Sequence, residues 1–168
     1  MDRTPHEIVN PLSLSDPIGY SHALVVTPGR TVYIGGQTSR RMDGVLTGDS
    51  LVQQFDQALA NMVEALRAAK AEPTHVVSMR VYTTSIGVYR INLNTLGSIY
   101  RRHMGRYYPP MSVVGVTELL TSGAQVELEC LAVVPDVYIE EAPEEASRES
   151  VEEVDATFTG GVSDPDRD

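Results

Sequence analysis

Residues 50–83 read SLVQQFDQALANMVEALRAAKAEPTHVVSMRVYT, a stretch that predicts an amphipathic helix followed by a strand. Ser50 and Gln53 have the spacing of a capping box, in which the side chain of each residue accepts a hydrogen bond from the backbone N–H of the other. Apolar residues then recur every three or four positions through about Ala69, which places an apolar stripe on one side of the helix. From His75 to Thr83, apolar and polar side chains alternate as in a half-buried strand. The stretch therefore predicts a helix that packs on a sheet.

Further elements flank this unit on both sides. The expected elements, in chain order, are strands at 22–27 and 31–35, a helix at 50–69, a strand at 75–83, a helix at 88–103, and strands at 112–117 and 125–134. Pro28-Gly29-Arg30 separates the first two strands and predicts a hairpin turn. Gly97 weakens the middle of the second helix, because glycine disfavours helix interiors.

The expected order is β-β-α-β-α-β-β, an α+β fold. Strand–helix–strand crossovers are right-handed, so both helices should lie on one face of a single mixed sheet. The other face is left bare. In the last strand, Glu127 and Glu129 point to this bare face, and Val126 points to the opposite face. A second copy usually covers a bare sheet face on a small domain. We therefore expect a homo-oligomer with sites between its subunits.

Charge divides the chain into a neutral domain and an acidic tail. Residues 136–168 contain 12 acidic and two basic residues, whereas residues 1–135 contain 11 of each. The tail is rich in small and polar residues, so we expect it to be mostly disordered, with a docking or regulatory role as the alternative. We divide the chain into an N-terminal extension (1–16), a domain (17–135) and the tail (136–168). A neutral domain without a basic stripe argues against a nucleic-acid partner.

Other classes of protein are disfavoured by what the chain lacks. It contains no apolar run long enough to span a bilayer, and its first residues lack the basic and apolar regions of a signal peptide. We therefore expect a cytoplasmic protein that does not bind membranes. Cys130 is the single cysteine, so no intrachain disulfide can form, and no Cys/His spacing resembles a zinc site. We expect no metal.

Five segments, spread over about residues 17–135, carry a recognisable pattern. They are PIGYSHA (17–23), VYIGGQ (32–37), VVSMRVY (76–82), PPMSVVGV (109–116) and VELE (126–129). In their order and spacing they resemble the RidA (YjgF/YER057c/UK114) family. The resemblance implies a chorismate-mutase-like sheet with two helices, in a homotrimer that encloses a barrel and forms three clefts at its subunit interfaces.

The resemblance also implies a chemistry. Characterised members of that family hydrolyse reactive enamines and imines, formed from amino acids by pyridoxal-phosphate enzymes, to keto acids and ammonia, and they need no cofactor. An arginine after the second helix grips the substrate carboxylate by a paired contact. That position here is Met111, in Pro109-Pro110-Met111-Ser112, and a thioether cannot replace a guanidinium. We therefore expect substrates other than ordinary 2-imino acids.

Four further family positions are retained. The resemblance implies that the Tyr20 hydroxyl orients substrate or water, and that the Glu127 carboxylate holds the attacking water or shuttles a proton. It implies that the backbone of Gly36 lines the cleft, and that Asn94 lies near the substrate, with Asn92 as the competing asparagine. An ordinary strand tyrosine and a strand-end turn are the structural alternatives for Tyr20 and Gly36.

The remaining candidates depart from the family or surround the same cleft. Glu127 has the alternative of an ion pair with Arg80, and Glu129 is expected to be a structural charge partner. His22 should lie on the same side of its strand as Tyr20, where an imidazole would serve as general acid or base, a surface or core histidine being the alternative. Tyr107-Tyr108 and Met111 predict an aromatic wall that favours apolar substrates, with a simple packing patch as the alternative.

Two functions stay open at this point. The first is a divergent RidA-like enzyme, cofactor-independent, in which Glu127, Tyr20 and His22 are catalytic and Gly36, Asn94, Met111 and Tyr108 bind substrate. It would add water to, or move a proton on, an imine, an enamine or a related conjugated metabolite. The alternative is a non-catalytic member that binds a small ligand or a partner protein in the same clefts.

Overall fold

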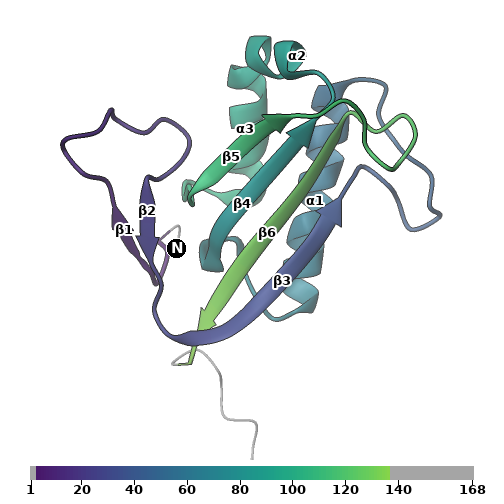
Figure 1. The fold of residues 1–168 in the computed structure, drawn as a ribbon. Coiled ribbons are helices and arrows are strands. Elements are labelled where there is room, and N and C mark those ends of the chain that lie inside the picture. Colours follow the sequence, from purple (N-terminus) through teal and green to yellow (C-terminus); the bar gives the residue numbers. More distant parts are fainter. Residues whose placement is uncertain (1–2, 137–168) are drawn as a thin grey trace, which may run out of the picture.

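The computed structural model describes residues 3–136 (Figure 1). All of the predicted acidic tail except Asp136 lies outside the described residues, so the expected disorder and the division of the chain at residues 16 and 135 stay predictions. Within the described range, no helix combines the length and the apolar character that crossing a membrane requires.

The long helix α1 (Leu51–Ala68) begins where the sequence predicts it to begin. Ser50 is its N-cap, and the Gln53 backbone N–H donates to Ser50 Oγ at 3.3 Å while the Ser50 N–H donates to Gln53 Oε1 at 3.2 Å. The capping box is thereby confirmed. The buried stripe of α1 contains Leu51, Gln54, Phe55, Ala58, Leu59, Met62, Val63 and Leu66. A short 3₁₀ helix, η1 (Pro73–His75), connects α1 to the next strand.

The sheet has four strands in the order β3-β6-β4-β5. The strands are β3 (Gly29–Gln37), β4 (Val76–Thr83), β5 (Met111–Gly115) and β6 (Val126–Pro135). Central β6 runs antiparallel to β3 and β4, and β4 runs parallel to β5. All helices lie behind the sheet in Figure 1, and its front face carries no helix. The α+β class, the mixed sheet and the helices on one face are therefore confirmed.

The predicted hairpin between the first two strands is wrong. β2 (Ala23–Val25) pairs antiparallel with β1 (Glu7–Val9), in a separate two-stranded sheet, while β3 pairs with β6. Gly29 accounts for the difference, because it starts β3 opposite Pro135, and a Cβ on Gly29 would lie 2.1 Å from the Val134 carbonyl oxygen. So close an approach needs a glycine, and it commits this segment to β6 rather than to a tight turn back onto β2.

The second helix is divided in two. α2 (Ile86–Ile91) and α3 (Leu93–Met104) meet at Asn92, whose Nδ2 donates to the Val88 carbonyl at 2.9 Å. A side-chain amide that bonds nearby backbone competes with the helix and favours its end. α3 continues through Gly97, so the break occurs at the asparagine and not at the glycine.

The β1–β2 hairpin stands beside the β5 edge of the sheet (Figure 1). Its base is held by buried His6, whose Nδ1 accepts a hydrogen bond from the Thr27 N–H at 3.2 Å. Since Nδ1 accepts, the proton is on Nε2, which lies 3.0 Å from the Val133 carbonyl oxygen in β6. The neutral imidazole thus joins the hairpin to the sheet.

We predict that Gly29→Ala destabilises the protein by about 1–3 kcal/mol, because the added Cβ meets backbone that cannot move without breaking the β3–β6 register. Gly87→Ala is the matched control, since a Cβ at Gly87 has nothing within 4 Å. Urea unfolding of both variants measures the difference. Equal stabilities would contradict the assigned register.

Stability should also fall with acidification. Burial lowers the pKa of His6 below its usual 6.5, against the opposing effect of the Val133 carbonyl. The unfolded chain therefore binds the proton first, so the stability is fully present above pH 6.5 and declines as the pH falls through the lowered folded-state pKa. Burial lowers the pKa of His75 in the same direction. Urea unfolding at pH 7.5 and 5.5 should show a smaller loss in His6→Gln than in the parent chain, and an identical loss would refute the role of His6.

Candidate functional site

A cavity of about 810 Å³ opens between α3, β5 and the loop before β2. Tyr20, Asn94, Tyr108 and Met111, four of the predicted site residues, all line it. The rest of its wall is largely aromatic and apolar, with Phe55, Tyr89 and Tyr100 among the lining residues. We call it the aromatic cavity. Concave apolar sites with a few polar groups are typical of small-molecule binding.

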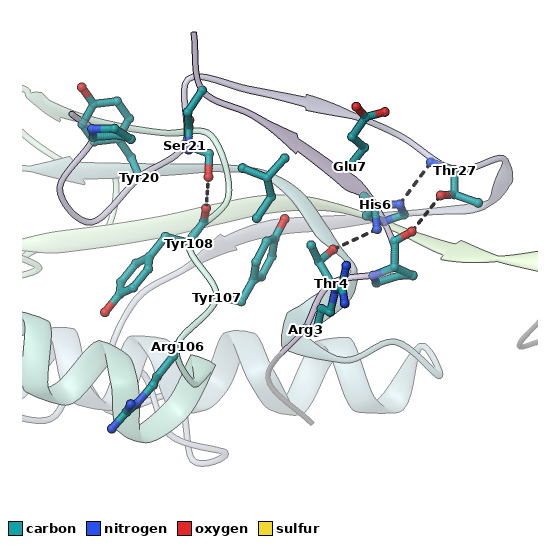
Figure 2. A pocket seen from close by; sticks show the side chains of 14 residues that line it. Arg3, Thr4, His6, Glu7, Tyr20, Ser21, Thr27, Arg106, Tyr107 and Tyr108 are labelled. Atoms are coloured by element: carbon teal, nitrogen blue, oxygen red, sulfur yellow. Dashed lines mark hydrogen bonds between the residues drawn. The ribbon is translucent and has the colours of Figure 1, made fainter. Parts of the chain in front are cut away.

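Tyr20 reaches the aromatic cavity because the loop that carries it is tied to the chain before β5. Ser21 Oγ donates to the Tyr108 carbonyl oxygen at 2.5 Å, and the Ser21 N–H donates to the Pro109 carbonyl oxygen at 3.3 Å. Figure 2 shows the Ser21 hydroxyl directed at Tyr108, with Tyr20 beside it. Two segments almost 90 residues apart in the chain are thereby held together.

Tyr108, which follows α3, and Tyr100 of α3 line the aromatic cavity, whereas Tyr107, the other tyrosine of the predicted wall, lines a different cavity. Tyr108 stacks on Tyr100 with ring centroids 5.0 Å apart and planes at 13°. The Tyr100 hydroxyl donates to the Tyr107 carbonyl oxygen at 2.9 Å, and the Tyr107 hydroxyl donates to the Val76 carbonyl oxygen at 2.7 Å. Burial raises the pKa of Tyr107 and of Tyr89 to about 12, so both rings are neutral near pH 7. The stacking places Tyr108 in the predicted aromatic wall.

The structure separates the two asparagines that the sequence left in competition. Asn94 lines the aromatic cavity, whereas Asn92 lies at the α2–α3 break and bonds Val88. Met111 begins β5 opposite Met79 and lines the same cavity, half-buried. At the position where the family resemblance implies an arginine, the cavity is thus lined by the side chain of a methionine.

His22 lies at the rim of a smaller cavity of about 260 Å³, which Tyr20 and Met111 also line. Its ring meets that of Tyr20 edge-on, with centroids 5.4 Å apart. Nε2 lies 2.8 Å from the Ser15 carbonyl oxygen, and the backbone N–H donates to Asn10 Oδ1 at 2.9 Å. These bonds hold the loop between β1 and β2, and the catalytic role of His22 stays a prediction.

Glu127 and Gly36 do not line the aromatic cavity within one chain. They lie together elsewhere on the sheet, where a Cβ on Gly36 would come within 2.0 Å of Glu127 Oε1. The alternative ion pair of Glu127 with Arg80 does not form, because Arg80 Nη1 pairs with Glu129 Oε1 at 3.1 Å. The Tyr82 hydroxyl also donates to Glu129, at 3.0 Å. Glu129 is the structural charge partner, and the Glu127 carboxylate is left against Gly36.

A second large cavity, of about 990 Å³, lies between the β1–β2 hairpin and the Arg106–Tyr108 segment (Figure 2). The sequence did not predict it, because residues 1–16 were taken as an extension; the short apolar run at Ile8 and Val9 was the available signal. Figure 2 shows the side chains of Arg106 and Glu7 pointing to different sides of this cavity. No group of three or more His, Cys, Asp or Glu able to hold a metal occurs in the described part of the chain.

The sequence and the fold of the chain are both similar to those of one protein family. The family model described as Endoribonuclease L-PSP matches residues 13–134. A human 2-iminobutanoate/2-iminopropanoate deaminase is 33% identical over 117 residues, which cover 68% of this chain and 79% of that protein. The Rid-family protein YyfB from Yersinia pestis superposes with a TM-score of 0.70 at 32% identity, over 77% of this chain and 98% of that one. Rv2704 from Mycobacterium tuberculosis, described as a YjgF/YER057c/UK114 member, gives 0.52 at 30% identity, over 77% and 99%.

Ser21→Ala should destabilise the protein by about 1 kcal/mol, because it removes one hydrogen bond from a buried hydroxyl and leaves the Tyr108 carbonyl without that donor. Ser122→Ala, at an exposed loop position, is the matched control and should change stability by less than about 0.5 kcal/mol. Urea unfolding of the two variants provides the comparison. If they are equally stable, Ser21 does not hold the Tyr20 loop.

Proposed function

The chain belongs to the Endoribonuclease L-PSP family, also called RidA or YjgF/YER057c/UK114, and on this premise we propose that it is a divergent, cofactor-independent enzyme of that family. Its reaction is the addition of water to, or the transfer of a proton on, an imine, an enamine or a related conjugated metabolite. The observation that carries the proposal is the aromatic cavity, where Tyr20, Asn94, Tyr108 and Met111 meet.

In the proposed hydrolysis, water adds to the carbon of the C=N bond and gives a carbinolamine. Its hydroxyl then loses the remaining proton of the water as the C=O bond forms, and the protonated nitrogen leaves as ammonia when the C–N bond breaks. Glu127 accepts a proton from the attacking water and returns it to the leaving nitrogen. Tyr20 orients the substrate or the water through its hydroxyl. His22 is the second candidate acid or base at the rim, although both its backbone N–H and its Nε2 have partners in the loop.

A homotrimer completes the site in this proposal. The sheet face opposite the helices carries Glu127, Gly36 and Tyr33. Tyr33 is 82% exposed to solvent in the single chain. Large aromatic side chains on a bare face favour an interface with another copy. Packing of that face against a neighbouring subunit would bring its Glu127 to the aromatic cavity, which one chain does not achieve.

Two further observations narrow the substrates and partners that we propose. A human relative is named for its action on 2-iminobutanoate and 2-iminopropanoate, and Met111 in place of an arginine disfavours such compact 2-imino acids here. The equal numbers of acidic and basic residues in 1–135 disfavour RNA, in spite of the family description, and we propose that the protein acts on small molecules in the cytoplasm.

The competing function is binding without turnover. It is favoured by the location of Glu127, which does not line the aromatic cavity within the described chain. In that case the cavity would hold a small apolar ligand or a partner's side chain, and no step would depend on the Glu127 carboxylate.

The two functions are separated by restoring the arginine. We predict that Met111→Arg hydrolyses 2-imino acids, generated in place by an amino-acid oxidase, at least about tenfold faster than the parent chain, because a paired guanidinium–carboxylate contact returns. Adding Glu127→Gln to that variant should abolish the gain, while adding Glu118→Gln, at an exposed loop position, should not. Keto-acid and ammonia release are the readouts.

Either of two results would contradict the enzyme proposal. Full activity in the Met111→Arg, Glu127→Gln double variant would remove Glu127 from the mechanism. No activity in a folded Met111→Arg trimer would mean that the site has lost more than its anchor and would favour binding without turnover.

A further inference from the structure

The aromatic cavity holds one charged side chain among the described residues that line it, and this is Arg101. The sequence did not single it out, because an arginine late in a helix is typical of a solvent-facing position that complements the helix dipole. The structure instead places it on the wall formed by α3, whereas the missing family arginine would have stood in β5 at Met111. The cavity therefore lacks the arginine that the family resemblance implies on the β5 wall, and it has an arginine on the α3 wall instead.

Arg101 belongs to a polar stripe on α3. Gly97 and Ser98 lie three and four residues after Asn94, and Arg101 lies four and three residues after them, so the four share one side of the helix. All four line the cavity. Arg101 Nη2 donates to Ser98 Oγ at 3.1 Å, and Ser98 Oγ in turn donates to the Asn94 carbonyl oxygen at 3.0 Å. A Cβ on Gly97 would lie 3.6 Å from Arg101 Nη1. The guanidinium thus lies back along the helix, over the glycine.

The charge of Arg101 is not neutralised by another described residue. The next arginine, Arg102, pairs with Asp56 Oδ2 at 2.6 Å, and Arg80 pairs with Glu129. The side chain of Arg101 bonds instead to the neutral hydroxyl of Ser98. A guanidinium has five N–H donors in a planar fork that matches a carboxylate, so donors remain for a ligand.

We propose that Arg101 is the anion anchor of the aromatic cavity, and that the cavity takes carboxylates with an apolar, ring-sized body. The inference rests on the proposed use of this cavity as the substrate site and deepens it by naming the substrate class. The carboxylate lies at the α3 wall on Arg101, and the apolar body packs among Phe55, Tyr89 and Tyr108. The reacting group then lies apart from the carboxylate, unlike in a 2-imino acid, where the two are on adjacent carbons.

The test is a pair of probes that differ in charge alone. Binding of 3-phenylpropanoate and of its neutral amide, 3-phenylpropanamide, is measured by calorimetry on the full chain. The parent chain should bind the acid at least about tenfold more tightly than the amide, since hydrogen bonds to charged groups are the stronger kind. The preference should weaken in high salt, because Arg101 is exposed at the cavity wall.

Substitutions assign the preference to one residue. Arg101→Gln should bring the ratio of the two affinities to about one, mainly by weakening binding of the acid. Arg90→Gln removes the same charge from an exposed position of α2 that does not line the cavity, and it should keep the parent ratio. Thermal unfolding of both variants checks that each is folded.

The possible failures are distinct. Equal affinity of the parent chain for acid and amide, or an unchanged ratio in Arg101→Gln, would overturn the anchor while the cavity remained a ligand site. Binding of neither probe would overturn the anchor together with the proposed use of the cavity. A ratio lost equally in Arg90→Gln would show a general charge effect and would also overturn it.

Discussion

The apolar stripe of α1 can be buried against only one face of the four-stranded sheet, and the remaining architecture follows from this constraint. α3 packs beside α1 on the same side, so the opposite face of β6 and β4 is left to Glu127, Glu129, Arg80 and Tyr82. Arg80 neutralises the Glu129 carboxylate, which also accepts a hydrogen bond from the Tyr82 hydroxyl, whereas Glu127 lies against Gly36. One face of the sheet is thus buried under the helices, and the other carries the charged side chains that our proposed trimer would bring to a neighbouring subunit.

The cavity depends on a different kind of contact, one between loops. Ser21 ties the loop before β2 to the segment before β5, and the stacked pair Tyr100–Tyr108 holds that segment to α3. Backbone groups that pair in this way are costly to release when buried, so the wall keeps its shape without a ligand. Met111 and Arg101 both line this cavity. In our proposal the carboxylate binds Arg101 on the α3 wall, which favours a longer substrate than an arginine on β5 would.

Membership of the family accounts for the fold, but it does not identify the substrate. A human relative is named for the deamination of 2-iminobutanoate and 2-iminopropanoate, small molecules whose carboxylate lies next to the reacting carbon. This chain has Met111 at the position where the resemblance implies an arginine that binds the substrate carboxylate. Specificity is a difference in binding free energy between competing ligands, so relocating one cation redirects it without altering the sheet that supports the site.

The sequence by itself determined the helix from Ser50, the strand alternation and the mixed sheet, because each of these depends on periodicity or on local spacing. Tyr20, Asn94, Met111 and Glu127 became candidates through the resemblance of five segments to a known family. It did not determine that β2 pairs with β1, that the second helix breaks at Asn92, or that Arg101 faces the cavity with Asn94. The pairing of β3 with β6 depends on the close approach of the Gly29 and Val134 backbones. The wall of the cavity depends on contacts between distant segments, such as the hydrogen bond from Ser21 to Tyr108. Such contacts join residues far apart in the chain, so only the tertiary structure decided them.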